Sequence, residues 1–250
     1  MLDLVVPLYN EAAILKSTVE TLEQELGSTG LSYRIILVDN NSSDETLSVA
    51  QDLADRSNTV QALHVPVQGK SRAIRAGWED SDADVLGFVD ADLSPGLDVI
   101  PQMVRVVEED RGLAVSSRLL PTSVTTRSFS RSLVSQSYNM MVRLLTRSPV
   151  SDHQCGLKVV HRDAWETIQP VTRSTEWFLD TEIILHALRL GIPIDEFAIR
   201  WHDADGSGVN TVSVTWKITL SLYRYWRQHG FPGETDVLTV HPIPRSRNTD

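Results

Sequence analysis

The chain has 250 residues, of which 41% are hydrophobic and 22% charged, and its formal net charge is -10. This length and apolar content favour one compact domain. The negative charge argues against a nucleic-acid-binding protein, because such proteins gain affinity from Lys and Arg at phosphates. The single cysteine, Cys155, excludes a disulfide within the chain and a cysteine-rich metal site.

No apolar run approaches the roughly 18 residues that are needed to cross a bilayer. The first residues also lack the basic segment and apolar segment of a secretion signal. We therefore expect a cytoplasmic protein that is at most peripheral, at the cytoplasmic face of a membrane.

In the first half of the chain, short β-branched runs alternate with amphipathic stretches, which is typical of a mainly parallel sheet flanked by helices. We predict strands over residues 2–6, 34–38, 60–65, 85–89 and 113–116. We predict helices over residues 11–26, 44–56, 70–79 and 97–109. Ser42, followed three residues later by Glu45, predicts a capping box before the second helix.

The second half is less regular. It predicts helices over residues 128–146, 163–168 and 179–190, strands over 157–160 and 194–200, and a last amphipathic helix over 212–229. We expect a single α/β domain over residues 1–230. Residues 231–250 are rich in Pro, Arg, Asn and Thr, and we expect a loose tail there.

Polar segments follow the first predicted strands, at residues 7–11, 39–46, 69–73 and 90–95. Ligands of open α/β sheets bind at the carboxyl ends of strands, so these segments are the place to expect chemistry. Asp39 can accept a hydrogen bond from the base or ribose of a nucleotide, and Lys70 can meet phosphates near a helix N-terminus. Neither a classical dinucleotide motif nor a P-loop motif occurs.

Asp90 and Asp92 are the most specific of these residues. Two carboxylates two residues apart on an extended chain point the same way, which suits one divalent cation such as Mg2+ or Mn2+. Such an ion bridges a diphosphate and neutralises charge on the leaving group. The alternative is that Asp92 or Ser94 merely caps the next helix. The position after a buried strand, within a series of polar strand ends, favours the metal.

Residues 113–151 contain no Asp or Glu, although arginines occur throughout the segment. The arginines are Arg118, Arg127, Arg131, Arg143 and Arg147. A solvated helix face is the common explanation for a charge run. The absence of acids over such a length favours a site for an anion or an anionic lipid.

These motifs together resemble the family 2 glycosyltransferases, and within them the dolichyl-phosphate mannose and glucose synthases. The resemblance rests on residues 7–11, 38–44, 69–70, 90–92, 117–118 and 152–158. It implies a GT-A fold and a nucleotide-sugar donor, either GDP-mannose or UDP-glucose. The donor-binding residues that it implies are Pro7, Tyr9, Glu11, Asp39, Lys70, Asp90 and Ala91. It also implies that Asp90 and Asp92 hold the metal, with Ser94 at the place of a third ligand.

The same resemblance implies an acceptor site for dolichyl or another polyprenyl phosphate. Its residues are Arg118, Arg131, Ser135, Gln154 and Trp201. The implied reaction inverts the anomeric carbon, with Asp92, Arg118 and Asp152 as catalytic residues. A lipid phosphate is already ionised and needs no base, whereas a sugar hydroxyl would need one, and Asp152 is then our choice. Asp180 fits either this acceptor side or an ordinary acidic first turn of a helix.

Three alternatives remain open from the sequence. One is a family 2 transferase that acts on a sugar hydroxyl, another a non-catalytic nucleotide-sugar-binding protein, and the third a nucleotidyltransferase. Trp216 and Tyr223, beside Lys217 and Arg224, give residues 212–229 a composition suited to the membrane interface, although a helix packed on the core would use similar residues. We therefore expect peripheral membrane contact, directly or through a membrane protein partner, and no nucleic acid.

Overall fold

The computed structural model describes residues 1–126, 129–202, 211–230 and 238–242, without the side chains of residues 129–131 and 211–214. In these residues the main sheet has eight strands in the order β10-β8-β5-β7-β4-β1-β2-β3. Their bounds are β1 (Leu2–Leu8), β2 (Tyr33–Asp39), β3 (Val60–His64), β4 (Val85–Val89), β5 (Leu113–Ser117), β7 (Leu157–His161), β8 (Ile194–Ala198) and β10 (Leu238–His241). β6 (Val124–Thr126) and β9 (Arg200–His202) form a second, small parallel sheet.

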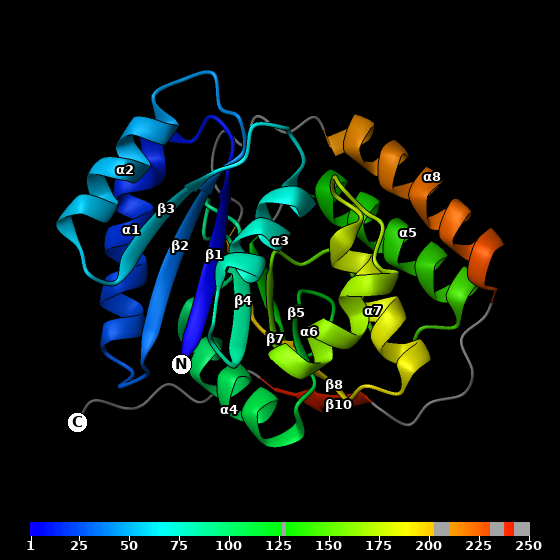
Figure 1. Cartoon of the computed structure of the whole chain (residues 1–250). Coiled ribbons are helices and arrows are strands. Elements are labelled where there is room, and N and C mark those ends of the chain that lie inside the picture. Colours follow the sequence, from blue (N-terminus) through cyan, green and yellow to red (C-terminus); the bar gives the residue numbers. More distant parts are fainter. Residues whose placement is uncertain (127–128, 203–210, 231–237, 243–250) are drawn as a thin grey trace.

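Helices cover both faces of the main sheet (Figure 1). Apolar side chains of α1 and α4 pack on one face together with α2, and those of α3, α5, α6, α7 and α8 pack on the other. The helices are α1 (Ala12–Gly27), α2 (Thr46–Arg56), α3 (Lys70–Asp80), α4 (Ile100–Asp110), α5 (Phe129–Thr146), α6 (Arg162–Ile168), α7 (Leu179–Leu190) and α8 (Thr211–His229), with short 3-10 turns η1 (Leu97–Val99) and η2 (Gln169–Val171). The predicted α/β fold is confirmed.

The central strands are apolar throughout because helices bury them on both sides. β4 is buried at every residue, and β7 runs antiparallel between β4 and β5 in an otherwise parallel sheet. The predicted strand over residues 194–200 is in fact two strands. The chain leaves the main sheet after Ala198, and Arg200–His202 pairs with β6 instead.

The expectation of a loose tail is wrong for four residues, because Leu238–His241 forms β10, parallel to β8 at the sheet edge. Nε2 of His241 is 2.8 Å from Oδ1 of Asp195, and the His241 ring stacks on Phe197. The domain boundary at residue 230 stays a prediction. None of the helices in the described ranges is both long and apolar enough to span a membrane.

The predicted capping box is also wrong. Oγ of Ser42 accepts a hydrogen bond from the backbone N–H of Asn10, not from the start of α2. The helix begins at Thr46, whose N–H donates to Oδ1 of Asp44 at 3.0 Å. The polar residues after β2 therefore tie the β1 and β2 ends together, which shapes the edge of the sheet.

Candidate active site

The carboxyl ends of four neighbouring parallel strands, β4, β1, β2 and β3, meet at one edge of the sheet (Figure 1). This edge brings together the segments that the sequence singles out. Pro7 lies in β1, Tyr9 beyond it is 45% exposed, and Asp39 closes β2 with 1% exposure. Asn10 and Asn41 adopt left-handed φ angles of 58° and 59°, which asparagine tolerates in tight turns.

The turn after β4 holds Asp90 and Asp92 in different environments. Asp92 is exposed, and its Oδ1 accepts the N–H of Ser94 at 3.1 Å. Leu93, between Asp92 and Ser94, has a left-handed φ of 47°. This conformation is costly for leucine and is found at functional sites. Ala91 is buried, and its carbonyl accepts from Oγ1 of Thr18.

The structure does not support the helix-capping alternative for this turn. The next helical residues begin only at Leu97, the start of η1, and neither η1 nor α4 has a side-chain cap. Asp92 and Ser94 therefore serve the turn itself and not the helix that follows.

Negative charge accumulates beside this turn. Burial raises the pKa of Glu11 above its ordinary value, and the carboxylates of Asp92, Asp44 and Asp90 raise it further. Burial likewise raises the pKa of Asp90. A divalent cation would relieve this repulsion, and the oxygens of Asp90, Asp92 and Ser94 are the ligand type that Mg2+ and Mn2+ accept.

This donor set fits a cation that is also held by its ligand. Among the described residues no three His, Cys, Asp or Glu side chains form a cluster that could hold a metal by themselves. Two carboxylates and a hydroxyl leave coordination positions for phosphate oxygens and water, as Mg2+ sites in phosphate-binding proteins commonly do. The site is thus suited to a metal that arrives with a diphosphate.

Gly156 fixes the position of Asp90. Its carbonyl accepts the N–H of Asp90 at 3.0 Å, and a Cβ at this glycine would lie 2.1 Å from Oδ2 of Asp90. Only glycine leaves room for the carboxylate. The sequence contains this glycine within the segment 152–158, but its spacing gives no sign of the contact.

A chain of charged side chains, partly exposed at Asp90 and buried at Asp180, links the turn after β4 to α7. Nζ of Lys70 is 2.7 Å from Oδ1 of Asp90 and 3.4 Å from Oδ2 of Asp180. Nζ of Lys158, fully buried, is 2.9 Å from Oδ1 of Asp180. Burial would lower the pKa of Lys70, but Asp180 and Asp90 raise it above its ordinary value. Lys70 is therefore a fixed positive charge beside the carboxylates, and Asp180 does more than favour a helix dipole.

Arg118 and Asp152 form a buried ion pair at the end of β5. The guanidinium donates from Nε to Oδ2 at 2.6 Å and from Nη2 to Oδ1 at 2.9 Å. Asp152 has no exposed surface, and it also accepts the N–H groups of Arg118 and Gln154 and an amide proton of Asn139. Burial would raise the pKa of Asp152, but Arg118 holds it well below its ordinary range.

That environment does not fit a general base. A base needs an accessible oxygen and a pKa near the working pH, and Asp152 has neither. Our expectation of Asp152 as the base for a hydroxyl acceptor is therefore not retained. Glu196, which the sequence did not indicate, supports the same loop by accepting the N–H groups of Ser151 and Asp152.

Most of the expected acceptor residues lie around this ion pair. The ring of Trp201 lies 4.7 Å from the guanidinium carbon of Arg118, within cation–π range. Gln154 donates from Nε2 to Oγ1 of Thr181 at 2.7 Å. Asn139 donates both to Asp152 and to the carbonyl of Ser135, so it joins Ser135 to the pair.

The other two expected acceptor residues, Ser135 and Arg131, both lie in α5. The buried Oγ of Ser135 has no hydrogen-bond partner within the part of the chain that the structure describes. Arg131 lies in α5, but its side chain is outside the described residues. The expected role of Arg131 stays a prediction.

The two halves of the site are continuous. Trp201 forms an isolated antiparallel bridge with Pro95, and the N–H of His202 donates to the carbonyl of Ser94 at 3.0 Å. Burial would lower the pKa of Arg118, but the carboxylate of Asp152 raises it, and the charge of Asp90 raises it further. A ligand at the turn of Asp90 and Asp92 would therefore lie beside Arg118 and Trp201.

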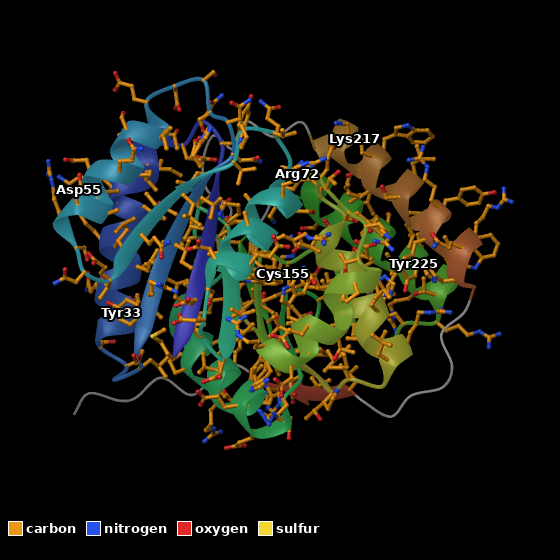
Figure 2. The ribbon with its side chains drawn as sticks, viewed as in Figure 1. Tyr33, Asp55, Arg72, Cys155, Lys217 and Tyr225 are labelled. Atoms are coloured by element: carbon orange, nitrogen blue, oxygen red, sulfur yellow. The ribbon has the colours of Figure 1, made fainter. Side chains whose placement is uncertain are left out.

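A pocket of about 550 Å³ lies between residues 173–178 and α8. Figure 2 shows Lys217 and Tyr225, which line it, on α8. Its other walls include Arg173, Trp177, Phe178, Leu220 and Arg224. The Trp177 ring is also 5.2 Å from Nζ of Lys70, so the pocket borders the charged network. Glu176, which pairs with Lys217, and Glu182 also line it, so the pocket combines apolar walls with charges of both signs.

Cys155, labelled at the centre of Figure 2, is fully buried. Burial raises the pKa of its thiol to about 12, and its Sγ accepts a hydrogen bond from Oγ of Ser116 at 2.9 Å. A buried protonated thiol is chemically inert. Cys155 therefore contributes packing to the site and not a nucleophile.

Residues 3–169 match the family model described as glycosyl transferase family 2. Glycosyltransferase AglD of Haloferax volcanii is 31% identical over 244 residues, covering 95% of this chain but 37% of AglD. The chain thus spans well under two thirds of that relative. The dolichyl-phosphate beta-glucosyltransferase of Drosophila melanogaster is 29% identical over 241 residues, with 90% of this chain and 74% of the relative covered.

Solved structures share the fold. Glucosyl-3-phosphoglycerate synthase from Mycobacterium tuberculosis, in complex with Mn2+, uridine-diphosphate-glucose and phosphoglyceric acid, superposes with a TM-score of 0.72. The sequence identity is 17%, with 94% of this chain and 81% of that chain covered. The likeness confirms the predicted GT-A architecture and extends no further at this identity.

Proposed function

The chain belongs to glycosyl transferase family 2, and on that premise we propose that it transfers glucose from UDP-glucose to dolichyl or another polyprenyl phosphate. One observation carries the proposal: the metal-type turn of Asp90 and Asp92 adjoins, through Trp201, an arginine site that is suited to an anion. The names of the dolichyl-phosphate beta-glucosyltransferase relatives support the sugar and the lipid.

The donor would bind at the ends of β1, β2 and β4. Asp39 accepts from the base, Pro7, Tyr9 and Ala91 line the nucleotide, and Lys70 meets the diphosphate. Lys70 can exchange its contact with Asp90 for a phosphate oxygen while Asp180 keeps its charge in place. Mn2+ or Mg2+, held by Asp90, Asp92 and Ser94, would neutralise charge on the departing UDP. The Mn2+ complex of the structural neighbour supports this choice of cation.

The acceptor would bind at Arg118, Ser135, Gln154 and Trp201, with Arg131 as a further cation. A phosphate oxygen attacks C1 of glucose, the bond from C1 to the UDP oxygen breaks, and that electron pair leaves with UDP. The nucleophile is already ionised near neutral pH, so no residue removes a proton. Asp152 then has the task of orienting Arg118 and stabilising its charge. The reaction depends on positioning and on charge stabilisation.

Membrane contact is proposed through α5 and α8, which lie side by side (Figure 1). Each helix buries one apolar stripe, which includes Val142 on α5 and Leu222 on α8, so both helices pack on the core. Each also exposes a second apolar stripe, formed by Leu133, Met140, Leu144, Trp216, Leu220 and Tyr223. The buried stripe matches the core-packing interpretation of α8, and the exposed stripe supports the proposed membrane contact. The exposed stripe would bring the 173–178 pocket, which Leu220 also lines, next to lipid.

A transfer assay tests the reaction. Labelled UDP-glucose, GDP-mannose and UDP-N-acetylglucosamine are each incubated with a polyprenyl phosphate in vesicles, with Mn2+, with Mg2+ or with chelator. We expect lipid-linked glucose from UDP-glucose only, and only with a cation. Lipid product from GDP-mannose alone would refute UDP-glucose as the donor. Hydrolysis of the donor without lipid product would refute polyprenyl phosphate as the acceptor and favour a sugar hydroxyl instead. Release of diphosphate would indicate a nucleotidyltransferase, and donor binding without turnover a non-catalytic binding protein.

Vesicle flotation tests the membrane contact. The double substitution of Trp216→Ser and Leu144→Ser should reduce binding to vesicles roughly tenfold or more, because it removes two apolar side chains from the interface. Ile14→Ser is the control, because Ile14 is also an exposed apolar residue but lies on α1, which packs on the opposite face of the sheet from α5 and α8. If the wild type did not bind vesicles, direct membrane contact through this face would be refuted.

A further inference from the structure

The carboxylate of Asp39 has one oxygen that is engaged and one that is not. Oδ2 lies 2.8 Å from Nδ1 of His64 and 3.4 Å from the N–H of Ser42. Oδ1 is buried and has no hydrogen-bond partner among the described residues. A buried acceptor without a partner is costly, which points to a donor supplied by a ligand.

His64 is fixed opposite Asp39 by the sheet. The two residues are register partners of β2 and β3, and the N–H of Val65 donates to the carbonyl of Asp39 at 2.8 Å. A carboxylate oxygen accepts, which assigns Nδ1 of His64 as the donor of this contact. The His64 side chain is 41% exposed, so it stands between the buried carboxylate and solvent. The sequence gives no sign of this pairing.

The pairing limits what Asp39 can recognise. Uracil presents one ring N–H between two carbonyl oxygens, so it needs a single acceptor. Guanine presents two adjacent N–H donors, on N1 and on the exocyclic nitrogen, and a carboxylate recognises it best with both oxygens. Because Oδ2 is occupied by His64, Asp39 offers one oxygen, which matches uracil.

We propose that His64 is a positioning residue that makes the donor site select uracil over guanine by occupying Oδ2 of Asp39. The inference rests on the proposed function, because it requires a nucleoside diphosphate at the strand ends. It goes beyond that function by assigning base selectivity to a residue that does not contact the base.

Calorimetric titration of UDP and of GDP, each with Mn2+, tests the proposal in the wild type and two variants. His64→Ala removes the imidazole contact and leaves Oδ2 with only the longer contact to the N–H of Ser42 among the described residues. His64→Asn keeps a nitrogen donor near the place of Nδ1 and is the conservative control. We expect the wild type to bind UDP at least about tenfold more tightly than GDP, about 1.4 kcal/mol. His64→Ala should reduce that ratio by roughly tenfold, and His64→Asn should restore most of it. In transfer assays, His64→Ala should raise the KM for UDP-glucose more than it lowers kcat.

The outcomes separate this inference from the proposed function. A merely structural role for His64 would weaken UDP and GDP binding alike, and an unchanged ratio in His64→Ala would overturn the inference. A wild type that binds GDP as tightly as UDP would overturn it too, while leaving a nucleotide site in place. A wild type that binds neither nucleotide would instead refute the proposed function.

Discussion

On the donor side, at the ends of β1, β2 and β4, some polar groups can still form hydrogen bonds to a ligand. Oδ1 of Asp39 lacks a partner among the described residues, and Asp92 is exposed. On the acceptor side, Asp152 is as buried as Asp39 but accepts from Arg118, Asn139 and Gln154 with both oxygens. In the sequence, Asp39, Asp92 and Asp152 look alike. The structure distinguishes Asp39 and Asp92, which can bind a ligand, from Asp152, which holds the framework of the site together. Unused bonding capacity, more than polarity, marks the residues that await a ligand.

The largest expected effect is a loss of stability on the acceptor side, where Asp152 is a framework residue. Asp152→Asn leaves the guanidinium of Arg118 buried without its counter-charge, which should cost about 3–5 kcal/mol of unfolding free energy in urea denaturation. Asp82→Asn removes the exposed partner of an Arg34 pair and should cost less than about 1 kcal/mol. If Asp152→Asn kept wild-type stability yet lost activity with an altered pH profile, Asp152 would be a catalytic base after all.

On the donor side, Asp92→Asn should leave stability nearly unchanged, because the side chain is exposed. Transfer should nevertheless fall by about 100-fold or more, since the variant loses a charged oxygen for the cation. Steady-state kinetics at saturating Mn2+ measure this loss. Asp52→Asn makes the same chemical change on the surface of α2, where Asp52 pairs with Arg56, and should keep full activity. Full activity in Asp92→Asn would place the metal elsewhere.

The contact between Gly156 and Asp90 offers a sharper test of donor geometry. The added Cβ of Gly156→Ala would push Oδ2 of Asp90 away, and a displacement of about 1 Å should lower kcat/KM roughly 10- to 100-fold. In Gly27→Ala the new Cβ would lie 3.7 Å from the Tyr33 hydroxyl, an ordinary van der Waals contact, so activity should persist. Equal kinetics in the two variants would show that the position of Asp90 is not critical.

The smallest expected effect concerns pH. Glu11 and Asp90 have raised pKa values, so protons compete with the cation as the pH falls. The affinity for Mn2+ with UDP should therefore decrease from about pH 8 to about pH 5.5. Proton release on binding should be larger at the lower pH, where more of each carboxyl group is protonated. Calorimetry in two buffers of different ionisation enthalpy measures that release, and none at either pH would contradict the raised pKa values.

The central strands could be predicted from the sequence because burial on both faces imposes continuous apolar runs, as in β4. The donor side could be predicted as a set because parallel strands end at one edge of the sheet. The limits were contacts between distant residues. Nothing local in the sequence shows that Arg118 saturates Asp152, that Gly156 makes room for Asp90, or that His64 meets Asp39. β10 was missed because its pairing with β8 depends on position more than on composition.

The central claim is that the carboxylates at the strand ends bind a nucleoside diphosphate, with Asp90 and Asp92 acting through a cation. Calorimetric titration of UDP into the wild-type chain, once with Mn2+ and once after chelation, tests it most directly. We expect binding with Mn2+ and an affinity at least about tenfold lower without it. Equal affinity under both conditions, or no binding of UDP in either, would contradict the account.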